Sequence, residues 1–408
     1  MFATLSSDVR QYLLITTNYW AFTLTDGALR MLVVLHFHAL GYSPLDIALL
    51  FIFYEIFGVV TNLLGGWLGA RLGLNRTMNI GLVLQVVALA MLAVPAVWLT
   101  VPWVMAAQAL SGIAKDLNKM SAKSAIKLLV PADAQGKLYQ WVALLTGSKN
   151  TLKGVGFFLG GVLLTLFGFT QSVLIMAVGL LFIWIVSVFT LKKALGKTAG
   201  KPKFRELFSK SRAVNILSAA RLFLFAARDV WFVVAIPVFL GEVLGWDHWT
   251  VGSFMACWVI GYGVIQSLAP YVTGKRSGVV PDGKTAVAWL FPLLMIPAIM
   301  AILLSTSMGL SLTSEWFQIG LIGGLMLFGA FFAVNSSLHS YLIVSYAKVN
   351  GVSLDVGFYY MANAMGRLLG TLLSGALYQL YGLEACLWIS SFFLFVAWLI
   401  SFKLPQTI

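Results

Sequence analysis

Runs of roughly 20 consecutive apolar residues recur along the whole chain and limit its fold more than any other feature. Lipid offers no hydrogen-bond partner to the backbone, so segments that cross it must be helices or strands of a closed barrel. Barrel strands alternate in polarity at every second residue, whereas Ser172–Leu191 and Leu387–Phe402 are apolar on all sides. A composition of 60% hydrophobic and 10% charged residues agrees with this pattern. The sequence therefore predicts an all-α membrane protein.

Twelve transmembrane helices are predicted, and turn residues separate them. The single long hydrophilic stretch, residues 192–212, divides them into two sets of six. We expect an N-terminal six-helix bundle at 1–191, a basic linker at 192–212 and a C-terminal six-helix bundle at 213–408. Two such halves are the plan of many secondary transporters. The expected spans are 12–37, 44–70, 77–99, 102–128, 137–168, 170–191, 213–240, 249–274, 285–305, 316–347, 354–382 and 384–402.

The loops on one predicted side carry the Lys and Arg residues, and those on the other side carry only acids. Because basic loops stay on the cytoplasmic side, both termini and the linker are expected in the cytoplasm. This distribution also explains the net charge of +13 without a nucleic-acid partner. Residues 203–212 can form a short interfacial helix, although a solvated basic linker is the alternative that we favour. The acids of the opposite loops are Glu242, Asp247, Glu315 and Glu384.

The predicted spans contain more cations than acids. A charge at the centre of a membrane costs about 2.5–3.5 kcal/mol on insertion scales, so unpaired cations must contact water, acids or a ligand. The surplus is 10 − 4 = 6 positive charges, or about five if Lys127 lies at the surface. It indicates a hydrated interior that binds a small, multiply charged anion. The cations are Arg30, Lys115, Lys119, Lys123, Lys127, Lys149, Lys153, Arg221, Arg228 and Arg367, and the acids are Asp26, Glu55, Asp116 and Asp229.

Helical spacing gathers the lysines on two faces. Lys115, Lys119 and Lys123 are spaced four residues apart and form one stripe, and Lys149 and Lys153 form a second. Such faces suit the oxyanion groups of a substrate, because lysines form charge-assisted hydrogen bonds with them. Lys123 lies nearer the cytoplasmic end, where we expect its side chain to extend to the surface.

Other charges have possible partners nearby in the chain. Asp26 and Arg30 are four residues apart and can pair, as can the neighbours Arg228 and Asp229. Proton coupling is the alternative role for the acids, and His339 can couple protons or pack between helices. The substrate-binding candidates are Arg30, Lys115, Lys119, Lys149, Lys153, Arg228 and Arg367. The candidates for proton coupling or charge pairing are Asp26, Glu55, Asp116, Asp229 and His339.

The two halves read as a repeat in which Asp26 corresponds to Asp229. Both residues follow a phenylalanine, at Phe22 and Phe225, and precede a glycine–aromatic turn and a new span. This pattern predicts one central site to which both bundles contribute.

The polar residues do not form an enzyme-like cluster in the sequence. A polytopic enzyme acting on lipid-linked substrates is expected to gather a nucleophile, a base or metal ligands in one interfacial loop. Here the polar residues lie mid-span in both halves, and Cys257 and Cys386 have no ligand spacing. We therefore expect no enzymatic activity, no cofactor and no metal, and keep the membrane enzyme as the alternative class.

The loop after the second span resembles the signature loop of the major facilitator superfamily. In that family a glycine-rich helix end meets an Asp-Arg-x-Gly-Arg turn. Ala70 replaces the usual aspartate, so the charge relay proposed for that loop lacks its acid here. Glycines of the fifth span also echo antiporter members and permit close helix packing. The matching loop residues are Gly66, Leu68, Arg71, Gly73 and Arg76, and the glycines are Gly147, Gly156, Gly160 and Gly161.

Within that superfamily, the chain is similar to the ArsJ family of organoarsenical efflux permeases. The resemblance implies export of 1-arseno-3-phosphoglycerate, which glyceraldehyde-3-phosphate dehydrogenase makes from arsenate. It also implies arsenate resistance. We expect one of the intramembrane acids to couple this export to protons, and we expect a monomer in the bacterial inner membrane. The charge pattern alone indicates a polyanion, so a sugar-phosphate or organic-phosphate exchanger is the alternative. The segments that carry the resemblance are Asn18–His38, Ser111–Lys123, Thr146–Gly154 and Ala227–Trp231.

Overall fold

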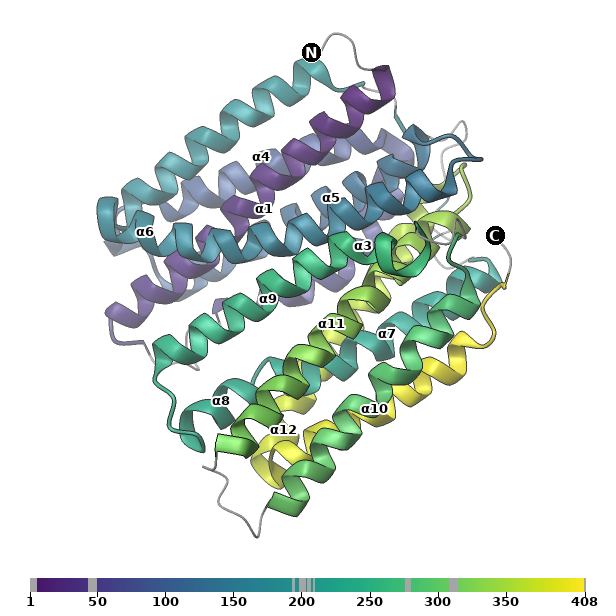
Figure 1. Ribbon diagram of the computed structural model, residues 1–408. Helices are drawn as coiled ribbons and strands as arrows, with labels where there is room; N and C mark the ends of the chain where they lie inside the picture. The colour runs from purple at the N-terminus through teal and green to yellow at the C-terminus, as the bar shows by residue number, and fades with distance from the viewer. Residues whose placement is uncertain are drawn as a thin grey trace. The chain divides into compact units, whose positions relative to one another are not determined.

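A computed structural model describes residues 6–42, 50–192, 195–197, 203, 207, 210–275, 280–307 and 315–406, and these contain helices and no strand (Figure 1). Residues 203–212, for which an interfacial helix was the less favoured alternative to a solvated linker, lie largely outside the described residues. The helices are α1 (Ser7–Ala39), α3 (Ile52–Leu72), α4 (Leu74–Leu92), η2 (Ala96–Trp98), α5 (Val101–Leu129), α6 (Gln135–Thr190), α7 (Arg212–Phe232), α8 (Ala235–Glu242), α9 (His248–Pro270), η4 (Tyr271–Lys275), α10 (Gly283–Ser307), α11 (Glu315–Tyr346) and α12 (Val352–Ser401).

The two longest helices each contain two predicted spans. α6 has 56 residues and bends at Gly168 (φ 73°), and α12 has 50 residues and bends at Gly382 (φ 76°). A positive φ is strained for any residue with a Cβ, so glycine permits the chain to reverse without a loop. Figure 1 shows α6 folding back on itself. The span boundaries predicted near these residues therefore correspond to sharp bends.

Eight helices in the described part of the chain are long and apolar enough to cross a membrane. Because α6 and α12 each supply two crossings, these helices account for ten of the predicted spans. The other two spans are α1 and α5, with 33 and 29 residues, which carry buried charges. The prediction of twelve membrane helices is thus confirmed over the described residues.

The chain packs as two compact units. The first contains residues 1–210 and 347–361, and the second contains residues 211–346 and 362–408. The beginning of α12 therefore packs with the N-terminal helices, although the chain reaches it only after α11. The sequence analysis placed the boundary between the bundles at the linker, and nothing in the sequence indicated that residues 347–361 belong to the first unit.

Glycines allow α1 and α6 to pack closely in the first unit. A Cβ at Gly156 would lie 2.7 Å from the carbonyl oxygen of Leu24, and one at Gly160 would overlap the carbonyl oxygen of Ala28. Small residues at such crossings let helix backbones approach, which is the main source of packing energy in a membrane. The glycine spacing noted in the fifth span therefore fixes how α6 lies against α1.

The second unit repeats this device and adds an aromatic core. A Cβ at Gly366 of α12 would overlap Leu222 of α7, and one at Gly370 would lie 2.7 Å from the carbonyl oxygen of Ala226. Trp231 of α7 is buried and packs edge-on against Phe328, with ring centroids 4.9 Å apart. These contacts fix α7 against α11 and α12.

Gly160→Ala should destabilise the protein, whereas the neighbouring Gly161→Ala should not. A Cβ at Gly161 meets nothing within 4 Å, while one at Gly160 overlaps backbone. Both substitutions raise helix propensity equally, so the difference between their free energies of unfolding measures the effect on the α1–α6 crossing. We expect this difference to be about 1–3 kcal/mol. Thermal melting in detergent measures it, and equal melting temperatures for the two variants would contradict the proposed role of Gly160.

Candidate functional site

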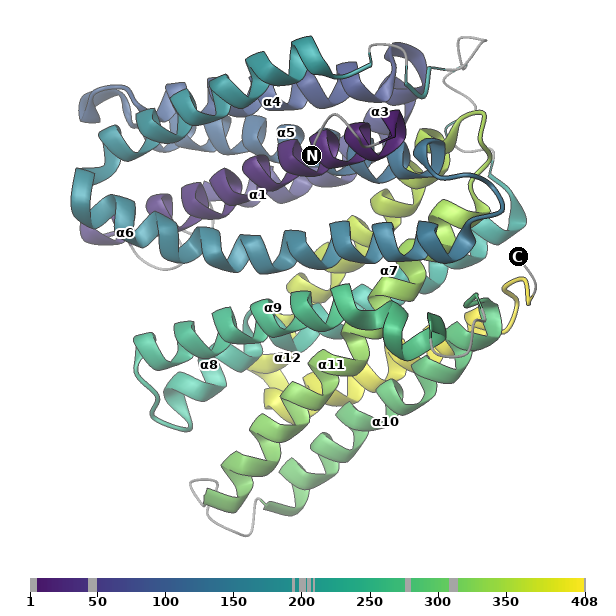
Figure 2. The ribbon, with the colours of Figure 1, turned by 45° about the horizontal axis from the view of Figure 1, so that its top comes forward.

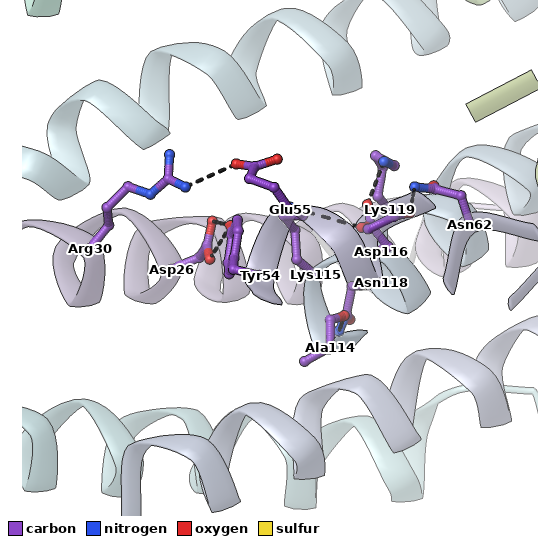
Figure 3. Close-up of polar contacts among 11 residues, drawn as sticks. Asp26, Arg30, Tyr54, Glu55, Asn62, Ala114, Lys115, Asp116, Asn118 and Lys119 are labelled. Carbon is purple, nitrogen blue, oxygen red and sulfur yellow. Dashed lines mark hydrogen bonds and ion pairs between the residues drawn. The ribbon is translucent and has the colours of Figure 1, made fainter. Parts of the chain in front are cut away.

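A buried carboxylate on α5 is shared by two lysines of the same helix (Figure 3). Asp116 is 1% exposed, pairs through Oδ1 with Lys119 and lies 3.8 Å through Oδ2 from the Nζ of Lys115. A Cβ at Gly58 would lie 3.0 Å from Oδ2, so the glycine leaves room for the carboxylate of Asp116 against α3. One negative charge therefore balances two positive ones, and this group of three keeps a net positive charge.

Tyr54 of α3 connects this group to α1. Its hydroxyl donates to Oδ1 of Asp26 at 2.8 Å, and Nζ of Lys115 lies 3.7 Å from the centroid of its ring. The ring face attracts the ammonium group while the hydroxyl satisfies the carboxylate. The sequence analysis missed Tyr54, because an aromatic residue in an apolar span carries no signal of its own.

Arg30 pairs across helices, not with Asp26 of its own helix. Its Nη2 lies 3.0 Å from Oε1 of Glu55, and its guanidinium lies 4.9 Å from the ring centroid of Tyr54 (Figure 3). The sequence allowed an Asp26–Arg30 pair, but the tyrosine hydroxyl contacts Asp26. The side chains of Arg30 and Glu55 are 27% and 34% exposed, so this ion pair remains accessible.

The lysines of α6 lie beside the α1 crossing. Lys149 and Lys153 are partly exposed and precede Gly156, which packs on α1. A Cβ at Gly27 would come within 2.7 Å of the carbonyl oxygen of Lys153, so the backbones of Lys153 and Asp26 are close neighbours. Lys149 and Lys153 therefore lie on the helix that packs against α1, which carries Asp26. A role for both lysines in substrate binding stays a prediction.

Lys123 is buried, which corrects the expectation that it extends to the surface. It is 2% exposed and donates to the hydroxyl of Tyr360, whose ring centroid lies 5.0 Å from Nζ of Lys119. Tyr360 lies on the part of α12 that belongs to the first unit. There Ser353 donates to the carbonyl oxygen of Gly66 at 2.8 Å. The lysine stripe therefore packs on a segment that the sequence assigns to the other bundle.

A second shared carboxylate lies in the second unit. Asp229 of α7 is 0% exposed and accepts through Oδ1 from the neighbouring Arg228. Its Oδ2 accepts from Nε of Arg367 on α12 at 3.2 Å. The predicted Arg228–Asp229 pair is present, and Arg367 joins it. Each unit thus contains a buried aspartate between two cations.

A neutral polar cluster holds Arg221 deeper in the second unit. Arg221 is 2% exposed, and it donates to Oδ1 of Asn363 at 2.8 Å and to the carbonyl oxygen of Ser336 at 3.2 Å. Tyr262 donates to the hydroxyl of Ser336 at 3.0 Å. His339 is completely buried, and neither of its ring nitrogens has a hydrogen-bond partner among the described residues. Its burial agrees with the helix-packing alternative, and proton coupling by His339 stays a prediction.

The glycine crossings give the register of the internal repeat. Gly156 and Gly160 pack on Leu24 and Ala28 of α1, as Gly366 and Gly370 pack on Leu222 and Ala226 of α7. Arg30 and Arg228 each follow the second contact by two residues. The corresponding charges of the halves are therefore these arginines. The predicted match of Asp26 with Asp229 is wrong in register, because it followed local sequence and not the contacts.

The described residues contain no group of three or more His, Cys, Asp or Glu side chains that could hold a metal ion. In each charged cluster one carboxylate lies between two cations. Each of these clusters therefore keeps a net positive charge.

Three solved structures resemble this one over their full length. The human organic anion transporter TETRAN matches with a TM-score of 0.75 at 15% identity, over 97% of this chain and 100% of that chain. The transporter FucP in its outward conformation matches with 0.77 at 12%, over 98% and 100%. A bacterial homologue of the iron transporter ferroportin matches with 0.71 at 15%, over 95% and 98%. At these identities the likeness shows the fold alone.

The comparison of sequences agrees with the fold. No curated protein sequence matches the chain. The family model described as Major Facilitator Superfamily matches residues 12–313, which is most of the chain and includes the loop at Gly66–Arg76. The protein is therefore a multi-pass membrane transporter that belongs to the major facilitator superfamily.

Proposed function

We propose that the protein exports a small polyanionic organoarsenical, 1-arseno-3-phosphoglycerate, by proton-coupled alternating access. The observation that carries the anionic substrate is the shared carboxylate: Asp116 between two lysines and Asp229 between two arginines. A cation that shares its acid can exchange part of that contact for an incoming oxyanion without being left unpaired. Each of these clusters therefore suits one anionic group of a substrate.

The arsenical identity of the substrate rests on the resemblance to the ArsJ family. Glyceraldehyde-3-phosphate dehydrogenase would supply the compound from arsenate, and its export would give arsenate resistance. The compound carries a phosphate and an arsenate group, and lysine and arginine bind such oxyanions with charge-assisted hydrogen bonds. In this proposal the protein works as a monomer in the bacterial inner membrane with both termini in the cytoplasm.

A sugar-phosphate or organic-phosphate exchanger is the second candidate, because the same cations would bind phosphate esters. Everted vesicles containing the protein distinguish the two. We expect labelled arseno-phosphoglycerate, generated by the dehydrogenase, to accumulate faster than 3-phosphoglycerate alone. Equal or faster uptake of the plain ester would favour the exchanger. Chemical conversion of the solute without accumulation would contradict transport and favour an enzyme.

Lys119→Ala should reduce the transport of the anion by about 10- to 100-fold, because a hydrogen bond to a charged group contributes about 1.5–3 kcal/mol. Asp116 retains Lys115 in this variant, so the protein should still insert and fold. Lys127→Ala, on the same helix, is the matched control and should change the rate less than about twofold. Initial rates in vesicles of equal protein content measure both. Equal rates for the two variants would exclude Lys119 from the anion site.

Glu55 is the best candidate for the proton carrier among the four intramembrane acids. Its side chain is 34% exposed, whereas Asp26, Asp116 and Asp229 are at most 6% exposed. A proton carrier must exchange with water, and an anionic substrate that binds Arg30 would replace Glu55 as the partner of that arginine.

Glu55→Gln should abolish transport driven by a pH gradient while preserving substrate exchange at equal pH, because exchange moves no net proton. Glutamine retains an oxygen for Arg30, so the helix contact persists. Glu315→Gln, at the exposed start of α11, is the control. Gradient-driven uptake that persists in Glu55→Gln would assign the coupling elsewhere, and loss of exchange as well would assign Glu55 to substrate binding.

A further inference from the structure

A groove of about 510 Å³ runs between α4 and the second half of α6 in the first unit. Figure 2 shows these two helices side by side. The end of the groove at the start of α4 is polar, with Arg76 and Asn79, and the remainder is apolar, with Ile80, Val83 and Trp184 among its lining residues. None of these residues belongs to the charged clusters.

The polar end is built to donate hydrogen bonds. Oδ1 of Asn79 accepts from the hydroxyl of Ser187 at 2.7 Å, and Ser187 in turn accepts from Asn18 at 2.8 Å. This series of hydrogen bonds fixes the orientation of the Asn79 amide and uses its carbonyl oxygen as an acceptor. The N–H groups of the amide therefore remain available to a ligand. Arg76 is exposed one turn earlier on the same helix. A guanidinium and an amide at this spacing suit a phosphate group.

The surface around the groove favours a lipid as the ligand. The second half of α6 exposes large apolar side chains, including Val178 and Phe182 at 65% each, and α4 exposes Ile80. In a bilayer such a surface faces acyl chains. A water-soluble anion would satisfy Arg76 and leave the apolar wall empty, whereas a phospholipid fills both parts.

Local charge favours an anionic headgroup over a zwitterionic one. Arg71 and Arg76 flank the turn into α4, and Asn75 donates to the carbonyl oxygen of Lys192 at 2.7 Å, which holds that lysine beside the same turn. Asp8 lies 3.7 Å from the Lys192 ammonium and is the acid that faces this group. The end of the groove is therefore net positive, as lipid-binding basic patches are.

We propose that this groove binds an anionic phospholipid. Arg76 and the amide of Asn79 hold the phosphate, and an acyl chain lies along Val83 and Trp184. At about 1.5 Å per residue, Val83 lies roughly 10 Å from Arg76 along α4, well within the length of a chain. The site is independent of the transported substrate.

Native mass spectrometry of the full-length protein in detergent tests the site, with phosphatidylglycerol and phosphatidylcholine of identical acyl chains as probes. The wild type should prefer phosphatidylglycerol. Arg76→Gln should lower that binding about fivefold, since one basic residue near a membrane surface contributes about that factor. It should lower phosphatidylcholine binding less, because the choline of that headgroup already balances the charge of its phosphate. Asn79→Asp retains the acceptor for Ser187 but repels the headgroup, so it should lower phosphatidylglycerol binding as well.

Matched variants distinguish this groove from general surface charge. Arg71 lies at the same end but outside the groove, with its guanidinium 4.9 Å from the ring centroid of Trp67, so Arg71→Gln should lower the preference much less than Arg76→Gln does. Val83→Trp should fill the apolar wall and weaken both lipids, whereas Val87→Trp, on an exposed position outside the groove, should not. These two variants keep the test decisive if Arg76→Gln fails to fold.

Three outcomes would overturn the proposal. They are no preference for phosphatidylglycerol in the wild type, equal losses in Arg71→Gln and Arg76→Gln, and binding of inorganic phosphate that displaces the lipid. The last result would assign the polar end to a free anion and remove the acyl chain from the site.

Discussion

A charge that folds into a membrane must keep a partner, and the membrane spans of this chain contain fewer acids than cations. The structure resolves this by sharing. Asp116 lies between Lys115 and Lys119, and Asp229 lies between Arg228 and Arg367. A shared carboxylate lowers the energy of both cations and leaves a net positive charge. This device gives both cations of each cluster an acidic partner and leaves each cluster with a net positive charge.

Close helix crossings make the sharing possible. Gly58 lets α3 approach the carboxylate of Asp116, and a Cβ added at Gly370 would lie 2.9 Å from the Cβ of Asp229, so glycine lets α12 pack closely against α7 there. A side chain at Gly370 would overlap the backbone of α7, and one at Gly58 would press against the carboxylate of Asp116. The glycines and the charged residues therefore depend on one another for close packing, although they are far apart in the sequence.

Much of the fold followed from the sequence. Apolar runs gave the helices and their number, and the loop at Gly66–Arg76 indicated the superfamily that the family model then showed. Predictions of contacts were weaker. Arg30 pairs with Glu55 instead of Asp26, and Lys123 is buried against Tyr360. Nothing in the sequence indicated that Tyr54 and Tyr360 would contact the charged side chains. Spacing along one helix limits which residues share a face, but it contains no information about what the facing helix presents.

The sequence by itself determined that the chain crosses a membrane with helices and that its spans carry surplus positive charge, because hydrophobicity and charge are properties of residue types. Tertiary structure alone decided which acid serves which cations, that residues 347–361 belong to the first unit, and that Arg30 corresponds to Arg228 in the repeat. These depend on distances between helices that are remote in sequence. In a membrane such distances are set by small residues at the crossings, so they become visible only once the helices are packed.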